Sequence, residues 1–304
     1  MTESNIAVTP DQAVRDIPIE ESAGPVQPSG SDRVVSLDFI RGIAVLGILF
    51  ANITAFGQPY VAYLWPPAIS GGMTAGDQAI WLFQFVLVDG KFRGLFTILF
   101  GAGIYLFMER AWARGKGKGL QARRLFFLLC FGLIHYFLIW RGDILSLYAV
   151  WGLVALLMIG WKAKTQLVVG LIATTLGSLL MAALMAFQFA AAEIPQVRDN
   201  MPPEAREQIE NVEPNTLASA EEEIALYQDG SYGEIVESAV KNDWGQLLSE
   251  LLLVGPVETI GLILIGMGLY RMGLFTGGIS RRKLLIWGWI GLIVGLVTSF
   301  LAGQ

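Results

Sequence analysis

The stretch Gln166–Ala191, QLVVGLIATTLGSLLMAALMAFQFAA, contains no charged residue and decides the fold class. An α-helix rises about 1.5 Å per residue, so a run of this length crosses the roughly 30 Å hydrocarbon core of a bilayer. Backbone N–H and C=O groups find no water there and must pair within the segment, which favours a helix. This stretch is therefore predicted to be a membrane-spanning helix.

Similar apolar runs recur along the chain. Hydrophobic residues account for 54% of the 304 residues and charged residues for only 15%, whereas soluble domains carry about 25% charge. Because one water-soluble core cannot bury such an excess, a soluble protein is excluded. The predicted fold class is an all-α polytopic transmembrane helix bundle of about seven spans, the other six being Val34–Phe56, Phe92–Met108, Ala122–Trp140, Ile144–Gly160, Leu247–Tyr270 and Leu284–Leu301.

One more apolar run, Ala79–Val88, is too short to span a bilayer alone. It is either an interfacial or re-entrant piece, or the first part of one long tilted helix that continues to Met108. In the second case, Gly90 would be the joint between the two parts.

The connecting segments predict the orientation of the bundle. Lys and Arg are concentrated at 109–124, 162–164 and 271–283, whereas the loop 57–78 contains neither. Short basic loops stay on the cytoplasmic side of a membrane. The N-terminus is therefore predicted to be cytoplasmic, and seven spans leave the C-terminus outside.

The polar segments divide the chain. Residues 1–32 are predicted to be a disordered cytoplasmic tail, residues 33–192 to hold the first five spans, and residues 246–304 to hold the last two. Between them, residues 193–245 form an acidic extracytoplasmic loop, with half of the 26 acidic residues of the chain. We expect this loop to form a small polar cap on the outer face.

Composition also limits the partners and cofactors. The net charge is −5 and basic character is confined to short loops, so no nucleic-acid partner is expected. Cys130 is the lone cysteine and His135 the lone histidine, so we expect neither an intrachain disulfide nor a metal site.

Charged residues inside predicted spans are functional candidates, because a charge in hydrocarbon costs on the order of 3 kcal/mol. Near the predicted inner face, Asp38 and Arg41 share one helix face at a spacing that suits a salt bridge. They are either an interfacial pair or a binding site for an anionic group. Glu258, two residues after Pro256, is predicted to lie in the inner half of its span.

A second group is predicted to converge near the outer face. Its members come from four different spans and their outer turns, and they are Asn52, Asp89, Lys91, Arg93, His135, Asp143 and Tyr148. We expect the polar and charged residues of both layers to bind substrate, apart from His135 and Asp143, which are the candidate catalytic residues.

His135 is the leading catalytic candidate. A neutral imidazole can take a proton from a hydroxyl or amine and can carry an acyl group, as acyl transfer requires. Asp143 is the natural carboxylate to orient it, although helix rise places Asp143 about 7 Å above His135 unless the intervening turn folds inward. The alternative is a buried histidine that bonds neighbouring helices.

Three motifs resemble those of the YeiB-like family of bacterial inner-membrane proteins, which carry the DUF418 domain: Leu37-Asp38-Phe39-Ile40-Arg41-Gly42, Asp89-Gly90-Lys91-Phe92 and Gly142-Asp143-Ile144-Leu145. The resemblance extends from about Val34 to Leu301. Because the family's chains continue for a few more spans, this sequence is expected to be a short or truncated form.

That family is similar to the transmembrane acyltransferase superfamily. The resemblance implies a multi-pass protein of the bacterial inner (cytoplasmic) membrane with no bound cofactor. It would take an acyl group from a cytoplasmic thioester donor such as acyl-CoA and deliver it to a glycan or lipid acceptor of the envelope at the outer face.

Two other classes of function fit the same residues. In a transporter of small solutes, His135 and Glu258 would shuttle protons, and Pro256 would break the helix that carries Glu258. In a non-catalytic membrane protein, the acidic outer loop would dock a partner. The sequence does not indicate the oligomeric state.

Overall fold

The computed structural model describes residues 35–63, 65–275 and 277–302, and every regular element in these ranges is helical. The all-α helix bundle predicted from the sequence is thus confirmed. The predicted tail, residues 1–32, lies outside the described residues.

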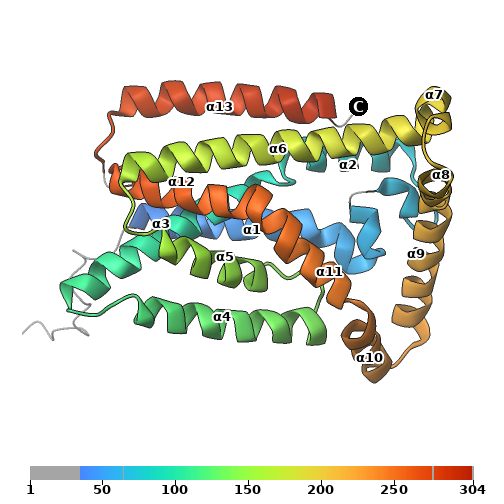
Figure 1. Cartoon of the computed structure of the whole chain (residues 1–304), viewed down its shortest axis with the longest axis horizontal. Helices are drawn as coiled ribbons and strands as arrows, with labels where there is room; N and C mark the ends of the chain where they lie inside the picture. The colour runs from blue at the N-terminus through green and yellow to red at the C-terminus, as the bar shows by residue number, and fades with distance from the viewer. Residues whose placement is uncertain (1–34, 64, 276, 303–304) are drawn as a thin grey trace, which may run out of the picture. The chain divides into compact units, whose positions relative to one another are not determined.

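Within the described residues, ten helical elements form the bundle shown in Figure 1. They are α1 (Val35–Gly57), α2 (Ala75–Leu87), α3 (Lys91–Ala113), α4 (Gly119–Leu138), α5 (Leu145–Leu157), α6 (Ala163–Glu193), α11 (Trp244–Ser249), the π-helix η3 (Glu250–Thr259), α12 (Ile260–Arg271) and α13 (Arg281–Ala302). The remaining helical elements of the described chain connect them at one end, and these are η1 (Tyr60–Tyr63), η2 (Pro66–Ala68), α7 (Pro195–Asp199), α8 (Pro203–Glu210), α9 (Val212–Asp229) and α10 (Tyr232–Asn242).

Six helical segments of the described chain are long and apolar enough to cross a membrane: Leu37–Gly57, Ala75–Ala113, Gly119–Leu138, Ala163–Glu193, Trp244–Arg271 and Arg281–Phe300. The predicted span Ile144–Gly160, the fourth along the chain, is not among these six, because α5 has only 13 residues. The apolar run includes residues of the connections at both ends of α5, which hydropathy does not separate from the helix.

The short run Ala79–Val88 belongs to a helix of its own. Thr74 and Asp77 form a capping box at the start of this helix, α2. Gly90 then adopts a φ of 73°, a left-handed conformation that glycine tolerates, and α3 begins directly after it. Gly90 is therefore the joint between two helices, in one candidate span of 39 residues.

The two ends of the bundle differ in charge. The basic end, defined by the connections 114–118 and 158–162, lies at the left of Figure 1, and the cap end, defined by 58–63, 65–74, 139–144 and 194–243, lies at the right. We predict that the basic end is cytoplasmic.

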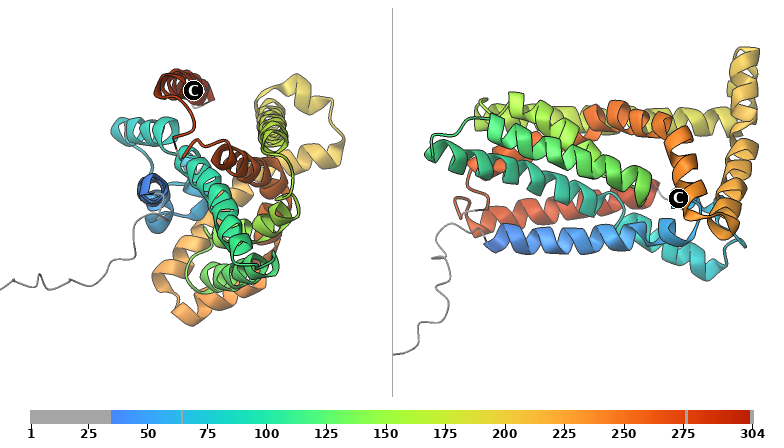
Figure 2. Two further views of the ribbon diagram at one scale, coloured as in Figure 1. Left: turned by 90° about the vertical axis from the view of Figure 1, so that its left-hand side faces the viewer. Right: turned by 90° about the horizontal axis from the view of Figure 1, so that it is seen from below.

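The α12 helix lies at the centre of the bundle and packs against α3, α5 and α6, as the end-on view in Figure 2 also shows. Glycines permit this close packing. A Cβ atom on Gly101 would collide with the backbone of Ile263, and one on Gly266 with the backbone of Ile98. Small residues at such crossings let helix backbones approach closely in membranes.

The helix that carries Glu258 changes its winding where Pro256 lies. Pro256 has no N–H, so in a π-helix the carbonyl of Leu251 loses the donor five residues further on. The indole N–H of Trp151, from α5, donates to this carbonyl at 2.9 Å. A side chain of the neighbouring helix therefore supplies the donor that proline lacks.

Candidate functional site

His135 and Asp143 lie in direct contact at the cap end. His135 is on the last turn of α4, and Asp143 is in the connection that leads to α5. The Nδ1 atom of His135 lies 3.1 Å from Oδ1 of Asp143. The turn between the two helices therefore folds inward, as this contact requires.

Asp143 is fixed in place by the start of α5. Its side chain has no exposed area. Its two carboxylate oxygens accept hydrogen bonds from the backbone N–H of Leu145 at 3.0 Å and of Ser146 at 2.8 Å. These N–H groups have no partner within the helix, and an Asp at a helix start commonly satisfies them. The carboxylate that faces His135 is thus a rigid acceptor.

The two nitrogens of His135 lie in different environments. Nδ1 is buried, and its approach to Asp143 is too poorly aligned to count as a hydrogen bond. Nε2 bonds to no described residue and is not enclosed, and the side chain is 32% exposed. A carboxylate on one nitrogen and a free second nitrogen are what a histidine base requires.

Arg93 and Glu258 form a second polar pair, between α3 and η3. Arg93 Nη2 lies 2.8 Å from Oε2 of Glu258. Glu258, predicted in the inner half of its span, thus pairs with a residue of the predicted outer group. Depth counted along a helix does not account for the length of an arginine side chain, which reaches far along the bundle.

Tyr148 points toward α3 and away from the histidine contact. Its buried hydroxyl shares a hydrogen bond of 2.8 Å with Thr97 Oγ1, and it also donates to the backbone carbonyl of Arg93 at 3.3 Å. Its ring stacks on Phe96 and Phe100. These contacts give Tyr148 a packing role that supports the Arg93 backbone.

The remaining candidates of the outer group are separate from His135. Asp89 accepts a hydrogen bond of 3.3 Å from the hydroxyl of Tyr63, and Lys91 donates to the carbonyl of Phe85 at 2.7 Å. No hydrogen bond or ion pair involves the side chain of Asn52 in the part of the chain that the structure describes. The structure thus divides the predicted outer group into separate contacts.

The predicted pair at the start of α1 is present. Arg41 Nη1 lies 3.1 Å from Oδ1 of Asp38, one helical turn away. Arg41 also approaches α3 at Gly103, where a Cβ atom would lie 3.4 Å from Nη2. The pair is near the basic end of the bundle, far along α1 from the residues of the cap end.

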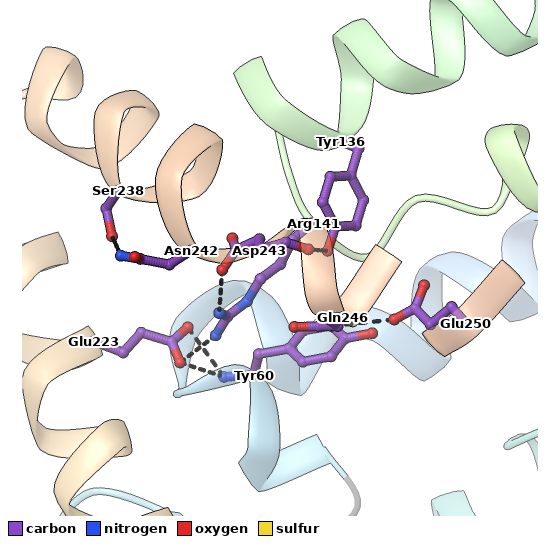
Figure 3. A network of polar contacts seen from close by, with 9 residues as sticks. All are labelled: Tyr60, Tyr136, Arg141, Glu223, Ser238, Asn242, Asp243, Gln246 and Glu250. Carbon is purple, nitrogen blue, oxygen red and sulfur yellow. Dashed lines mark hydrogen bonds and ion pairs between the residues drawn. The ribbon is translucent and has the colours of Figure 1, made fainter. Parts of the chain in front are cut away.

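A network around Arg141 joins the cap to the bundle, as Figure 3 shows. Arg141 forms ion pairs with Glu223 of α9 and, at 3.9 Å, with Asp243. Glu223 also accepts from the backbone N–H of Tyr60 at 3.2 Å, and the guanidinium lies over the Tyr60 ring. The hydroxyl of Tyr136 donates to the carbonyl of Asp243 at 3.0 Å.

Burial dominates the electrostatics of this network. It raises the pKa of Asp243 above its usual value, and the nearby Arg141 offsets part of that rise. Burial, with a smaller effect of Glu250, raises the pKa of Tyr60 to about 12. Tyr60 is therefore neutral at physiological pH.

The sequence contained a signal for this network that our predictions did not use. Arg141 is the only basic residue in a turn predicted to face outward, where positive charge is disfavoured. Such a residue needs acidic partners, and the acidic loop provides them. Which of its carboxylates pair with Arg141 depends on the path of the loop, and local spacing does not reveal that path.

Comparisons with known proteins find bacterial relatives. The chain is 44% identical over 123 residues to a protein of Escherichia coli (strain K12) named "Uncharacterized protein YeiB". It is 41% identical over 150 residues to "Uncharacterized protein YxaH" of Bacillus subtilis (strain 168). The matches cover 40% and 45% of this chain.

These alignments also cover only part of each relative. The matched segments span 30% and 35% of the two relatives, or about a third of the length of these curated proteins. No family model matches the chain, and no solved structure matches it. The resemblance indicated by the motifs is nevertheless confirmed by these alignments, and the chain is similar to the YeiB-like proteins of bacteria.

Proposed function

We propose that the protein is a membrane acyltransferase in which His135 is the general base and Asp143 orients it. The observation that carries this proposal is the 3.1 Å contact between His135 Nδ1 and a fully buried carboxylate. This contact leaves Nε2 free to accept a proton. The basic end would receive an anionic thioester donor, such as acyl-CoA, from the cytoplasm.

The proposed reaction moves one proton and one acyl group. Nε2 of His135 takes the proton from a hydroxyl of the acceptor, while the hydroxyl oxygen bonds to the carbonyl carbon of the thioester. The carbon–sulfur bond then breaks, and the leaving thiolate receives the proton from His135. Asp143 stabilises the imidazolium that exists between these two transfers.

The test is acyl transfer by purified protein in liposomes made from bacterial lipid extract. Radiolabelled acetyl-CoA is the donor, and both released thiol and labelled product are measured. His135→Ala should reduce transfer by about 10²-fold or more, which is the range for loss of a general base. Asp143→Asn should reduce it less, because the amide oxygen still accepts from one N–H of α5.

The matched control is Cys130→Ala, on the same helix. This residue is half-buried and has no place in the proposed step, so its turnover should equal that of the natural chain. Full turnover by His135→Ala, in protein that still inserts into liposomes, would remove the histidine from the mechanism. No turnover by the natural chain would contradict the proposal itself.

A carrier is the second candidate, because a specific observation favours it. The Arg93–Glu258 ion pair joins α3 to the π-helix that contains Pro256, within the span Trp244–Arg271. Charged pairs and broken helices near the middle of a span are common in transporters. Proton entry into pyranine-loaded liposomes without a thioester, abolished by Glu258→Gln, would support the carrier over the enzyme.

A further inference from the structure

The helix that carries His135 lies at the edge of the bundle. α4 packs chiefly against α5 and forms the lower border of the view in Figure 1. Its outward face is apolar, since Phe131 is 63% exposed, Ile134 50% and Leu138 41%. In a membrane-spanning helix, such a face is in contact with lipid.

His135 lies at the border of this apolar face. It follows Ile134 directly and lies one helical turn from Phe131 and Leu138. Its side chain is 32% exposed, whereas that of its partner Asp143 is not exposed at all. The accessible part of the imidazole is therefore next to lipid-facing side chains, and the carboxylate is covered by protein.

Two aromatic residues, one in the cap and one directly after it, indicate the level of His135 in the bilayer. Tyr232 of α10 donates its hydroxyl to the carbonyl of Leu138 at 2.6 Å, and the ring centroid of Trp244, at the start of α11, lies 4.5 Å from that of Phe137. Tyr232 and Trp244 are both exposed. Tyr and Trp are enriched at the border between hydrocarbon and water.

The imidazole of His135 thus lies on the hydrocarbon side of the border between hydrocarbon and water, and close to it. His135 lies three residues before the end of α4 at Leu138, which is about 4.5 Å along the helix axis. α10 is placed over the end of α4, on the side of the water. A substrate that meets Nε2 would come from the side, out of the lipid, with its reacting group at the level of the headgroups.

We propose that the acyl acceptor is a lipid-anchored hydroxyl compound that reaches His135 laterally from the outer leaflet. This inference rests on the proposed function. A lipid acceptor fits better than a water-soluble glycan, because the exposed side chains beside the imidazole on α4, Phe131, Ile134 and Leu138, are apolar and would contact a lipid tail rather than a free sugar.

The activity test compares two acceptors that both present a free hydroxyl on a glycerol backbone, one of them attached to lipid tails. Proteoliposomes that contain dioleoylglycerol receive labelled acetyl-CoA, and parallel liposomes without it receive glycerol in the buffer. Label should enter dioleoylglycerol at least tenfold faster than glycerol. Equal or faster labelling of glycerol would overturn the lipid acceptor and leave acyl transfer standing, whereas no thioester consumption would overturn the proposed function.

A second measurement tests the placement of His135 without activity. A spin label is attached at His135→Cys in the Cys130→Ala background, and its collisions with oxygen and with a water-soluble nickel complex are compared. Phe131→Cys is the lipid-facing control, and Glu204→Cys of α8 is the water-facing control. Position 135 should resemble position 131, with oxygen dominating. Dominance of the nickel complex, or closure to both reagents, would overturn lateral access.

Discussion

Glu234 is held by the hydroxyl and the backbone N–H of Ser231 in a capping box at the start of α10. These hydrogen bonds lower the pKa of Glu234 below its ordinary value of 4.5. A carboxylate whose pKa is lowered in the folded state stabilises that state above its unfolded pKa and loses this effect as the pH falls through its folded pKa.

We therefore expect α10 to loosen in acid. Hydrogen exchange of the α10 amides, corrected for the intrinsic effect of pH, should lose protection as the pH falls below about 4.5, the ordinary glutamate value. Glu234→Gln should make this protection nearly independent of pH, because a glutamine can form the box without titrating. An unchanged acid transition in Glu234→Gln would show that another group is responsible.

Sequence spacing predicted contacts between residues of one helix better than contacts between helices. Asp38 and Arg41 were expected on one face and are paired, because the helical period alone brings them together. Glu258 was placed in the inner half of its span with no partner named for it, and in the structure it pairs with Arg93. That contact depends on how α3 and η3 pack, which no local pattern contains.

At the scale of elements, the joint role of Trp151 and Pro256 can be measured as a double-mutant cycle. Trp151→Phe removes the donor to the Leu251 carbonyl, and an unsatisfied buried carbonyl costs about 1–3 kcal/mol. In the Pro256→Ala background, the restored N–H of residue 256 can take over this carbonyl. Trp151→Phe should therefore lower the free energy of unfolding by less in the Pro256→Ala background than in the natural chain, as measured in detergent. An equal loss of unfolding free energy in both backgrounds would contradict the idea that the Trp151 indole replaces the missing N–H of Pro256.

The crossing of α3 and α12 gives a second prediction at this scale. Gly266→Ala places a methyl group against the backbone of Ile98, and overpacking of this kind costs about 1–3 kcal/mol or more. Gly288→Ala on α13 is the matched control, because a Cβ there meets nothing within 4 Å. Thermal unfolding in detergent should show a lower midpoint for the first variant alone. Similar midpoints for both would mean that the helices can separate without cost.

The elements themselves were mostly predictable from hydropathy. Long runs such as Gln166–Ala191 lie within helices, here α6, because a bilayer permits few alternatives. Hydropathy did not reveal where α5 begins, since Asp143 starts that helix through hydrogen bonds to its first N–H groups. The same cap draws the turn inward and produces the contact with His135, which helix rise alone did not require.

At the scale of the whole molecule, the network of Arg141 attaches the cap to the bundle. Glu223→Ala removes the ion pair to Arg141 and the bond to the Tyr60 N–H together. Hydrogen exchange should then increase in α9 and in the loop 58–63, while α6 and α12 keep their protection. Glu221→Ala, an exposed neighbour on α9, should leave exchange unchanged. No difference between the two variants would mean that other contacts hold the cap.

The proposed mechanism depends most on which side of the membrane each end of the bundle faces. Single cysteines at Gly117 in the basic end and at Glu204 in the cap end, in the Cys130→Ala background, can be exposed in intact cells to a thiol reagent that does not cross membranes. We predict that Glu204→Cys is labelled and that Gly117→Cys is labelled only after the cells are opened. Labelling of Gly117→Cys in intact cells would place the basic end outside and His135 near the cytoplasm, which contradicts the account.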